Sequence, residues 1–361
     1  IAIAPGMGLN SFFAFAVVLA LGITWQKALG AVFIASLIFL VLSFTKFRNV
    51  LINSIPESLK HSITAGIGLF IAFIGLQGSK IIVDSPATLV TFGHASDPVV
   101  LLTIFNLFVT VVLMMFNVRG NIFIGMVITA IIALFNGMIT LPPSLFVWPT
   151  GLEHTAMQMD IKGVFDDNLY AIIFTFFLIT LFDTTGTMIG IAEQAGLIKD
   201  GKFPRIKSAL LADAVGSTAG AMLGTSPTSA YIESGAGVAV GGRTGFSSVV
   251  VALLFGLLLF CAPLAQMLAS IPAITAPALI IVGFLMMSSL RNIDWNDFEE
   301  SFPAFLIVFL MPLSYSIAIG IGIGFIIYPL LKIIRGKAAE VHPLMYLFQI
   351  LFFIQIGFLG H

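Results

Sequence analysis

Two stretches interrupt long apolar runs of this chain, Ala4-Pro5-Gly6-Met7-Gly8-Leu9-Asn10 and Gly224-Thr225-Ser226-Pro227-Thr228-Ser229. Proline and glycine disrupt the hydrogen-bond ladder of a helix, so each run is expected to break here. If the runs lie in a bilayer, the freed backbone groups must be buried in protein or face a wet cavity. Each break would then direct unpaired N–H groups at a ligand, whereas two ordinary helix kinks are the alternative.

The composition places the surrounding chain in a membrane. Of 361 residues, 59% are hydrophobic and 9% are charged, whereas a soluble domain carries about 25% charged residues. So little charge cannot cover a water-facing surface of this size, and the solvent must be mostly lipid. The formal net charge of −1 provides no field that would attract nucleic acid. A single cysteine, Cys261, excludes an internal disulfide framework and a cysteine-based metal site.

Twelve apolar runs are long enough to cross a bilayer, for which about 20 residues are needed. They cover residues 3–22, 28–45, 60–82, 98–117, 120–137, 167–191, 207–224, 228–242, 245–265, 273–290, 301–317 and 318–334. A shorter apolar stretch at 344–358 either spans or lies in the interface. The sequence therefore predicts a multi-pass, all-helical protein of the cell membrane.

The basic residues indicate the orientation. If the first run starts in the cytoplasm, thirteen of the sixteen basic residues fall in cytoplasmic segments, and Lys27, Lys80 and Lys162 fall outside. Cytoplasmic loops carry the excess of Lys and Arg in membrane proteins, so this orientation is preferred. The long loop 138–166 then faces outward, and the C-terminus is cytoplasmic unless 344–358 spans.

A weak internal repeat connects the two halves of the chain. Ser54-Ile55-Pro56 opens the third run and Ser270-Ile271-Pro272 opens the tenth. A further pair lies upstream, at 24–28 and 244–248, and another lies downstream, at 124–125 and 323–324, in the same order. The matching units are seven spans apart, so the halves run in opposite directions across the membrane. Inverted repeats with interrupted helices at corresponding places are typical of secondary transporters, and the interruptions mark the substrate site.

Three carboxylates lie within the apolar runs, namely Asp183, Asp213 and Glu233. An ionisable group inside a span is costly and indicates function. Such an acid can exchange protons, and its oxygens accept hydrogen bonds from the N–H groups of a neutral ligand. The alternatives are a structural acid for Glu233, a helix-end residue near water for Asp183 and a brace between helices for Asp213. Asn10 is either a turn residue or an amide ligand.

The sequence contains no enzyme motif. Gly6-Met7-Gly8 and Gly235-Ala236-Gly237 lack the strand–loop–helix context of a phosphate loop. Zinc motifs, paired histidines and a serine elbow are also absent from the sequence. A channel is the second hypothesis, because broken helices can line pores. The inverted repeat favours a transporter.

Three motifs together resemble one known family. They are Ala4 to Asn10, Phe182-Asp183-Thr184-Thr185-Gly186-Thr187, and Thr228-Ser229-Ala230-Tyr231-Ile232-Glu233-Ser234 followed by Gly241-Gly242-Arg243-Thr244-Gly245. They resemble the AzgA-type purine permeases, a branch of the nucleobase–cation symporter 2 group related to the uracil and xanthine permeases. The resemblance extends over nearly the whole chain.

The resemblance implies fourteen spans in two inverted seven-span repeats, divided into a core and a gate domain, with two interrupted helices that cross as short strands. About twelve spans are recognisable, and the family's first two are expected to precede Ile1. The implied core domain consists of residues 1–45 and 167–265, and the implied gate domain consists of residues 46–137 and 266–335. An external loop at 138–166 and a C-terminal tail at 336–361 complete the chain.

The resemblance also implies a site. Asp183 and Glu233 would hold the base, with Asn10 on the first interrupted helix and Asp213 next to the site. Thr187 occupies a position where some uracil-type relatives carry a histidine. Thr187, Thr228 and Ser229 are further candidate contacts, although hydroxyls near breaks commonly bond to the backbone.

The leading hypothesis is import of a purine nucleobase (guanine, hypoxanthine or adenine) by proton symport with alternating access. The proton would be carried by Glu233, Asp183 or Asp213. A uracil or xanthine carrier of the same architecture is the nearest alternative. We expect no cofactor and no nucleic-acid partner, and the family analogy implies a homodimer.

Overall fold

The computed structural model describes residues 1–361 except Met7, Gly8, Ser11, 46–53, 198–204, 232–233, Val240 and 359–361. It separates into two compact units, of which unit 1 comprises residues 1–70, 151–245 and 286–361, and unit 2 comprises residues 71–150 and 246–285. Both units take segments from both halves of the chain. These units are defined by compactness alone, so they do not test the expected core and gate domains, which stay a prediction.

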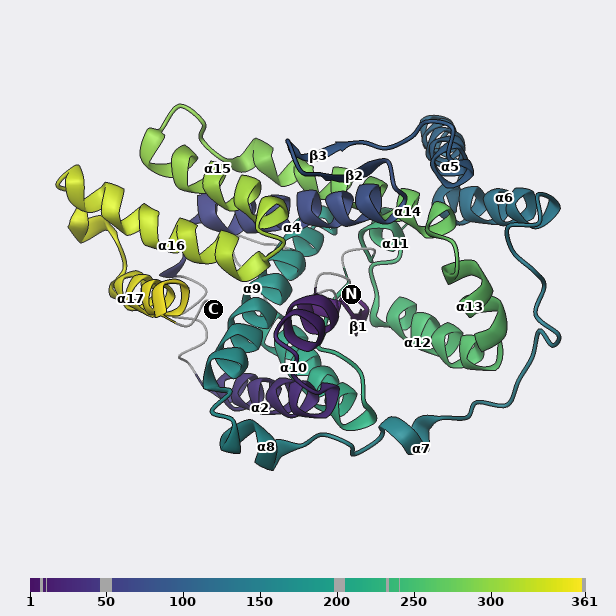
Figure 1. The fold of residues 1–361 in the computed structure, drawn as a ribbon. Helices are drawn as coiled ribbons and strands as arrows, with labels where there is room; N and C mark the ends of the chain where they lie inside the picture. Colours follow the sequence, from purple (N-terminus) through teal and green to yellow (C-terminus); the bar gives the residue numbers. More distant parts are fainter. Residues whose placement is uncertain are drawn as a thin grey trace. The chain divides into compact units, whose positions relative to one another are not determined.

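Within its described residues, unit 1 contains two short strands, ten α-helices and three other helical segments. Figure 1 draws the helices as coiled ribbons and the strands as arrows. These elements are β1 (Ile3–Pro5), the π-helix η1 (Phe12–Ala20), α2 (Trp25–Phe44), α4 (Glu57–Gly78, up to Phe70), α7 (Leu152–Thr155), α8 (Ile161–Asp166), α9 (Tyr170–Gln194), α10 (Ile206–Leu223), β4 (Thr228–Ala230), α11 (Ser234–Ala239), η2 (Met287–Asn292), α15 (Phe298–Leu313), α16 (Ile317–Ile334), η3 (Ala338–Glu340) and α17 (Pro343–Phe358).

Unit 2 contains the end of α4 and a small antiparallel hairpin followed by helices. The further elements are β2 (Ile82–Ser85), β3 (Leu89–Phe92), α5 (Pro98–Met115), α6 (Asn121–Phe135), α12 (Gly245–Phe260), α13 (Ala262–Ala269) and α14 (Pro272–Met286). The hairpin pairs Ile82 with Phe92 and Ser85 with Leu89. It begins at the end of the apolar run 60–82 and ends before the run 98–117, in a segment for which the sequence predicted no strand.

Small side chains bring the helices of unit 1 together. Ala28, Ala31 and Ala35 form one face of α2 and pack with the fully buried Phe176 of α9 and Ala221 of α10. Residues three and four apart share a helix face, and small ones let backbones approach closely in a membrane protein. Sequence spacing therefore positions α9 and α10, the two helices that carry Asp183 and Asp213.

In unit 2, a buried amide compensates for a proline. Pro277 lies inside α14 and has no N–H to offer the carbonyl of Ala273. Asn106 of α5 is fully buried, and its Nδ2 donates to the carbonyls of Ala273 and Ile274, both at 3.1 Å. Thr110 donates to its Oδ1 at 3.1 Å. A polar side chain within an apolar run is therefore explained by a backbone group that would otherwise be unsatisfied.

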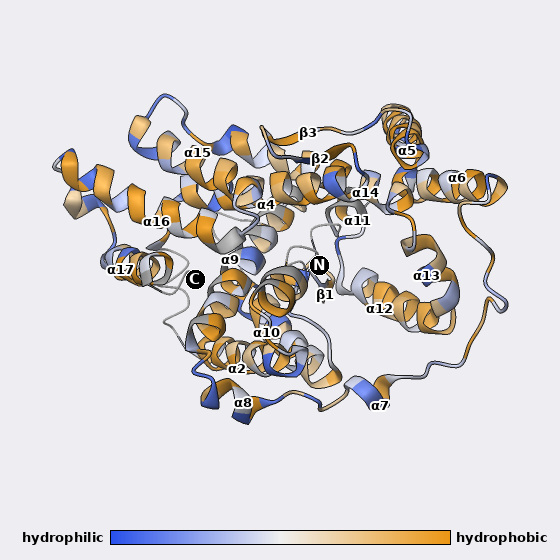
Figure 2. Ribbon diagram, in the orientation of Figure 1, coloured by the Kyte–Doolittle hydropathy of each residue, from blue (hydrophilic) through white to orange (hydrophobic). Residues whose placement is uncertain are grey.

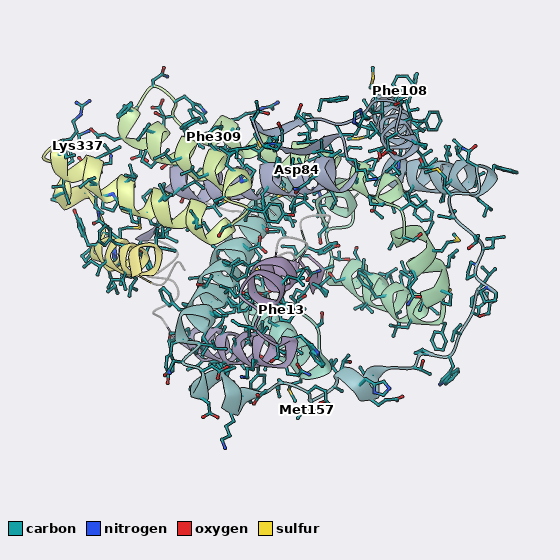
Figure 3. All side chains as sticks on the ribbon, viewed as in Figure 1. Phe13, Asp84, Phe108, Met157, Phe309 and Lys337 are labelled. Atoms are coloured by element: carbon teal, nitrogen blue, oxygen red, sulfur yellow. The ribbon has the colours of Figure 1, made fainter. Side chains whose placement is uncertain are left out.

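The length and the exposed apolar surface of the helices are those expected in a lipid environment. Within the described residues, four helices are long and apolar enough to cross a membrane, namely Trp25–Phe44, Glu57–Gly78, Pro98–Met115 and Pro272–Asn292. Apolar residues dominate α5, α6 and α12 in Figure 2, and Phe108 of α5, labelled in Figure 3, is 67% exposed. Apolar surface of this extent is unusual on a soluble protein.

Every predicted apolar run coincides with a helix, a pair of helices or a strand and a helix. Some runs are therefore not one straight span. The run 245–265 is two helices, α12 and α13, bent by 91° at Cys261. Pro263, in the first turn of α13, cannot continue the hydrogen bonding of α12. The two interrupted runs appear as β1 with η1 and as β4 with α11.

Candidate functional site

The two breaks meet as a pair of antiparallel strands. β1 pairs with β4 in the register Ile3–Ala230, Ala4–Ser229 and Pro5–Thr228. The contact continues beyond β4, where the N–H of Tyr231 donates to the carbonyl of Ala2 at 2.9 Å. Each interrupted helix therefore supplies backbone partners that the other lacks, which is a requirement inside a bilayer.

The second break packs against helix α10. A Cβ on Gly220 would lie 2.8 Å from Cγ2 of Thr225 and 3.2 Å from Cγ2 of Thr228, so only glycine permits this approach. Ser217 is fully buried and its hydroxyl donates to the carbonyl of Thr228 at 2.6 Å. The break is thus fixed against a helix by both packing and hydrogen bonding.

Asp183 lies beside the strand pair. Ser229 of β4 donates its hydroxyl proton to the Asp183 carboxylate. A Cβ on Gly6 would lie 2.7 Å from the Ser229 Oγ and 3.8 Å from Oδ2 of Asp183. The missing side chain of Gly6 therefore leaves the carboxylate accessible from the first break.

Asp213 lies behind this position and is fully buried. Its Oδ2 accepts a hydrogen bond from Thr184 at 2.7 Å, and Thr184 follows Asp183 directly on α9. Among the described residues, none donates to the second oxygen of Asp213, Oδ1. A buried polar atom without a partner is uncommon and suggests a role beyond bracing.

Asn10 connects the two breaks. Its backbone N–H donates to the carbonyl of Gly6 at 2.8 Å, as in a helical turn. Its side-chain Oδ1 accepts a hydrogen bond from the hydroxyl of Ser226. The turn interpretation and the ligand interpretation of Asn10 are therefore compatible. Ser226 was not predicted as a site residue, although its place before Pro227 in the second break was a usable signal.

The other predicted contacts separate into two groups. Thr187 is buried on α9 four residues after Asp183, so both lie on the same helix face. Thr228 is engaged with Ser217, with its Oγ1 at 3.0 Å from the Ser217 Oγ. Glu233 lies outside the described residues, and its role stays a prediction. The structure therefore brings Asp183, Ser229 and the first break together and places Asp213 and Thr187 nearby.

In the part of the chain that the structure describes, the polar side chains at the strand pair do not form a metal site. No three histidine, cysteine or acidic side chains of the described residues gather as a metal ion would require. The polar groups near the strand pair are a carboxylate, which accepts hydrogen bonds, and an amide and hydroxyls, which both accept and donate. Together they suit a neutral ligand with N–H and carbonyl groups.

The architecture is that of a multi-pass membrane transporter, in which crossed interrupted helices mark the binding site. The family model Xan_ur_permease, described as "Permease family", matches residues 1–338, and the chain belongs to this family. The members of this family are permeases and not enzymes, as the sequence predicted.

Individual relatives are similar over almost the entire chain. "Guanine/hypoxanthine permease PbuO" of Bacillus subtilis is 52% identical over 99% of this chain and 84% of that protein. "Putative permease MJ0326" of Methanocaldococcus jannaschii is 47% identical over 99% of this chain and 82% of that protein. "Adenine permease AdeP" of Escherichia coli is 43% identical over 99% of this chain and 80% of that protein.

Solved structures share the fold at low sequence identity. The transmembrane domain of a cyanobacterium bicarbonate transporter, BicA, matches 88% of this chain and 79% of that domain with a TM-score of 0.60 and 15% identity. The structure of SLC26A9 matches 90% of this chain and 54% of that protein with a TM-score of 0.55 and 14% identity. The predicted fold class, helical inverted repeats with two interrupted helices, is confirmed.

Proposed function

We propose that this permease imports purine nucleobases together with protons across the cell membrane by alternating access, with its C-terminus in the cytoplasm. Guanine and hypoxanthine are the preferred substrates, and adenine is a third. The observation that carries this proposal is the similarity over 99% of the chain to permeases named for guanine and hypoxanthine. The bicarbonate transporter shares the fold only, at 15% identity.

The contacts at the strand pair support a neutral base as ligand. The Asp183 carboxylate accepts a hydrogen bond from Ser229 and retains lone pairs for further donors. A purine base offers ring and exocyclic N–H groups to such an acceptor. Glu233, four residues after Ser229 at the end of the second break, is proposed as the second acid at the base.

Proton coupling is proposed to use the acids next to the base. Asp213 lies fully buried behind Asp183, with Thr184 between them and one carboxyl oxygen without a described partner. A carboxylic acid in such a setting can bind a proton in one state and release it when the surroundings change. Asp183, Asp213 and Glu233 are the candidate carriers.

The first test is an uptake panel with the full-length protein in cells that lack purine transport. Radiolabelled hypoxanthine uptake is expected to saturate, to be inhibited by guanine and adenine, and to collapse with a protonophore. Asp183→Asn and Glu233→Gln are expected to reduce uptake at least about tenfold, since each removes a charge-assisted hydrogen bond.

Asp84→Asn is the matched control, because Asp84 is an exposed acid on the hairpin strand β2 (Figure 3). It is expected to transport as the wild type does. Uptake of radiolabelled uracil or xanthine, with no uptake of hypoxanthine, would transfer the assignment to the other branch of the family. Uptake that does not saturate would indicate a channel.

A further inference from the structure

A hydroxyl on one break holds the side-chain amide of the other. Ser226, in the second break, donates to Oδ1 of Asn10, which lies 216 positions earlier in the first break. We propose that Ser226 is a positioning residue: it holds the Asn10 carbonyl so that the amide Nδ2 is presented to the base as a hydrogen-bond donor. This inference rests on the proposed function and deepens it.

The local backbone keeps Ser226 in place. Gly224 ends α10 with φ of +92°, and the N–H of Thr225 donates to the carbonyl of Gly220 at 2.9 Å. On the other side Pro227 is buried and has a restricted φ, which also biases Ser226 toward an extended conformation. Ser226 therefore lies between two anchored points, and its hydroxyl has little freedom to follow a moving partner.

The amide of Asn10 has two unlike ends. Its oxygen accepts, whereas its nitrogen carries two donors. The hydrogen bond from Ser226 occupies the oxygen, so the nitrogen is the end that is left for a ligand. Without the Ser226 hydroxyl the amide could turn over and present its carbonyl instead.

The resulting site would contain a donor and an acceptor around the same glycine. Gly6 accepts from the backbone of Asn10, and a Cβ on it would lie 3.8 Å from the Asp183 carboxylate. The carboxylate accepts and the Asn10 nitrogen donates. This pair complements a base that has an N–H group and a carbonyl or ring-nitrogen acceptor, as the 6-oxopurines do.

The test combines removal of one protein hydroxyl, that of Ser226, with removal or weakening of one hydrogen-bond acceptor of the ligand at a time. It compares how each change alters binding alone and together. Inhibition constants are measured for hypoxanthine and for three analogues that retain N1–H: 6-mercaptopurine, whose sulfur accepts hydrogen bonds far more weakly than the 6-oxo oxygen, 7-deazahypoxanthine and 3-deazahypoxanthine. In the wild type, the analogue in which the acceptor facing Asn10 is removed or weakened is expected to bind about tenfold more weakly, as for one lost hydrogen bond. In Ser226→Ala this discrimination should fall below about threefold.

Ser226→Thr keeps the hydroxyl and should keep the discrimination. Ser43→Ala removes a buried hydroxyl that bonds within α2, to the carbonyl of Phe39 at 2.8 Å, and should behave as the wild type does. All values are compared per molecule of protein in the membrane, so poor expression does not mimic the effect.

Three outcomes would overturn the inference. Ser226→Ala could weaken hypoxanthine and every analogue by the same factor, could retain the full discrimination, or the wild type could discriminate against none of the analogues. If instead the wild type takes up no purine base, the proposed function fails, and this inference fails with it.

Discussion

At Gly224 the backbone and its neighbour both require glycine. Its φ of +92° is costly for a residue with a side chain, and a Cβ would lie 2.5 Å from the Cβ of Thr155 and 2.7 Å from its carbonyl oxygen. Thr155 is the last residue of α7, in the segment between α6 and α9, so this glycine lets that segment reach the end of α10. The second break begins at this point.

Gly224→Ala is therefore expected to destabilise the protein by about 1–3 kcal/mol through backbone strain, with a further loss through the clash. Gly22→Ala separates the two causes, because Gly22 has φ of +67° and a methyl group added there would meet nothing within 4 Å. Thermal unfolding in nanodiscs should place the Gly22 variant between the wild type and the Gly224 variant. Equal midpoints for the two variants would refute the clash.

The sequence predicted which residues belong to the candidate site but not which hydrogen bonds they form. Asp183, Asp213 and Asn10 stood out because polar residues are rare in apolar runs. Their bonds could not be predicted, since Ser226 and Asn10 are 216 positions apart and Thr184 and Asp213 are 29 apart. No local periodicity reports such contacts. Only the fold brings these residues together.

Among the elements, α15 and α16 are joined by a buried group of charges. Glu299, 3% exposed, contacts Lys332 at 3.2 Å and Lys337 at 3.0 Å. Lys332 also contacts Glu300 at 3.0 Å, and Glu300 accepts from Ser58 of α4. Lys337, labelled in Figure 3, lies just beyond the end of α16 and precedes η3. The hydrogen bonds from Lys337 and Lys332 outweigh the effect of burial and hold the pKa of Glu299, in the first turn of α15, below its ordinary value of 4.5.

A depressed pKa of the folded state gives this contact a pH dependence. Its stabilisation is complete above pH 4.5 and is lost as the pH falls through the lower folded pKa. Lys337→Met should therefore lower the unfolding temperature more at pH 7 than at about pH 3. Lys162→Met, at an exposed position of α8, is the control and should change the unfolding temperature at neither pH. An equal loss at both pH values would contradict an ionic cause.

Sequence patterns found the elements more readily than their bends. Hydropathy identified the helices because each must bury its backbone polar groups in lipid, and proline and glycine identified the breaks. The 91° bend at Cys261 was missed, since a proline in the first turn of a helix is often harmless. The β2–β3 hairpin was missed because its strands have only four residues each.

Segments of the two units alternate along the sequence. Unit 1 takes three segments of the sequence and unit 2 takes two, and each unit contains residues from before and after position 150. The first segment of unit 2 includes a mostly exposed, irregular stretch around Pro142 and Pro143. Neither half of the sequence therefore contains a complete unit.

A protein divided between Pro143 and Ser144 is expected to reassemble. Co-expressed halves should co-purify from the membrane and restore hypoxanthine uptake, whereas either half alone should not. A cut after Leu107, inside α5, is the control and should prevent recovery, because it breaks the hydrogen-bond ladder of a helix. Independent activity of one half would contradict the interleaved organisation.

The strand pair also has a consequence for synthesis. Pro5 pairs with Thr228, and the two partners are 223 positions apart in the sequence. At about 5–20 residues per second, the ribosome needs roughly 11–45 seconds to make the intervening chain. Throughout that interval the first break is in or near the membrane without its partner strand. The translocon, an insertase or another nascent segment must shelter those backbone groups until β4 emerges.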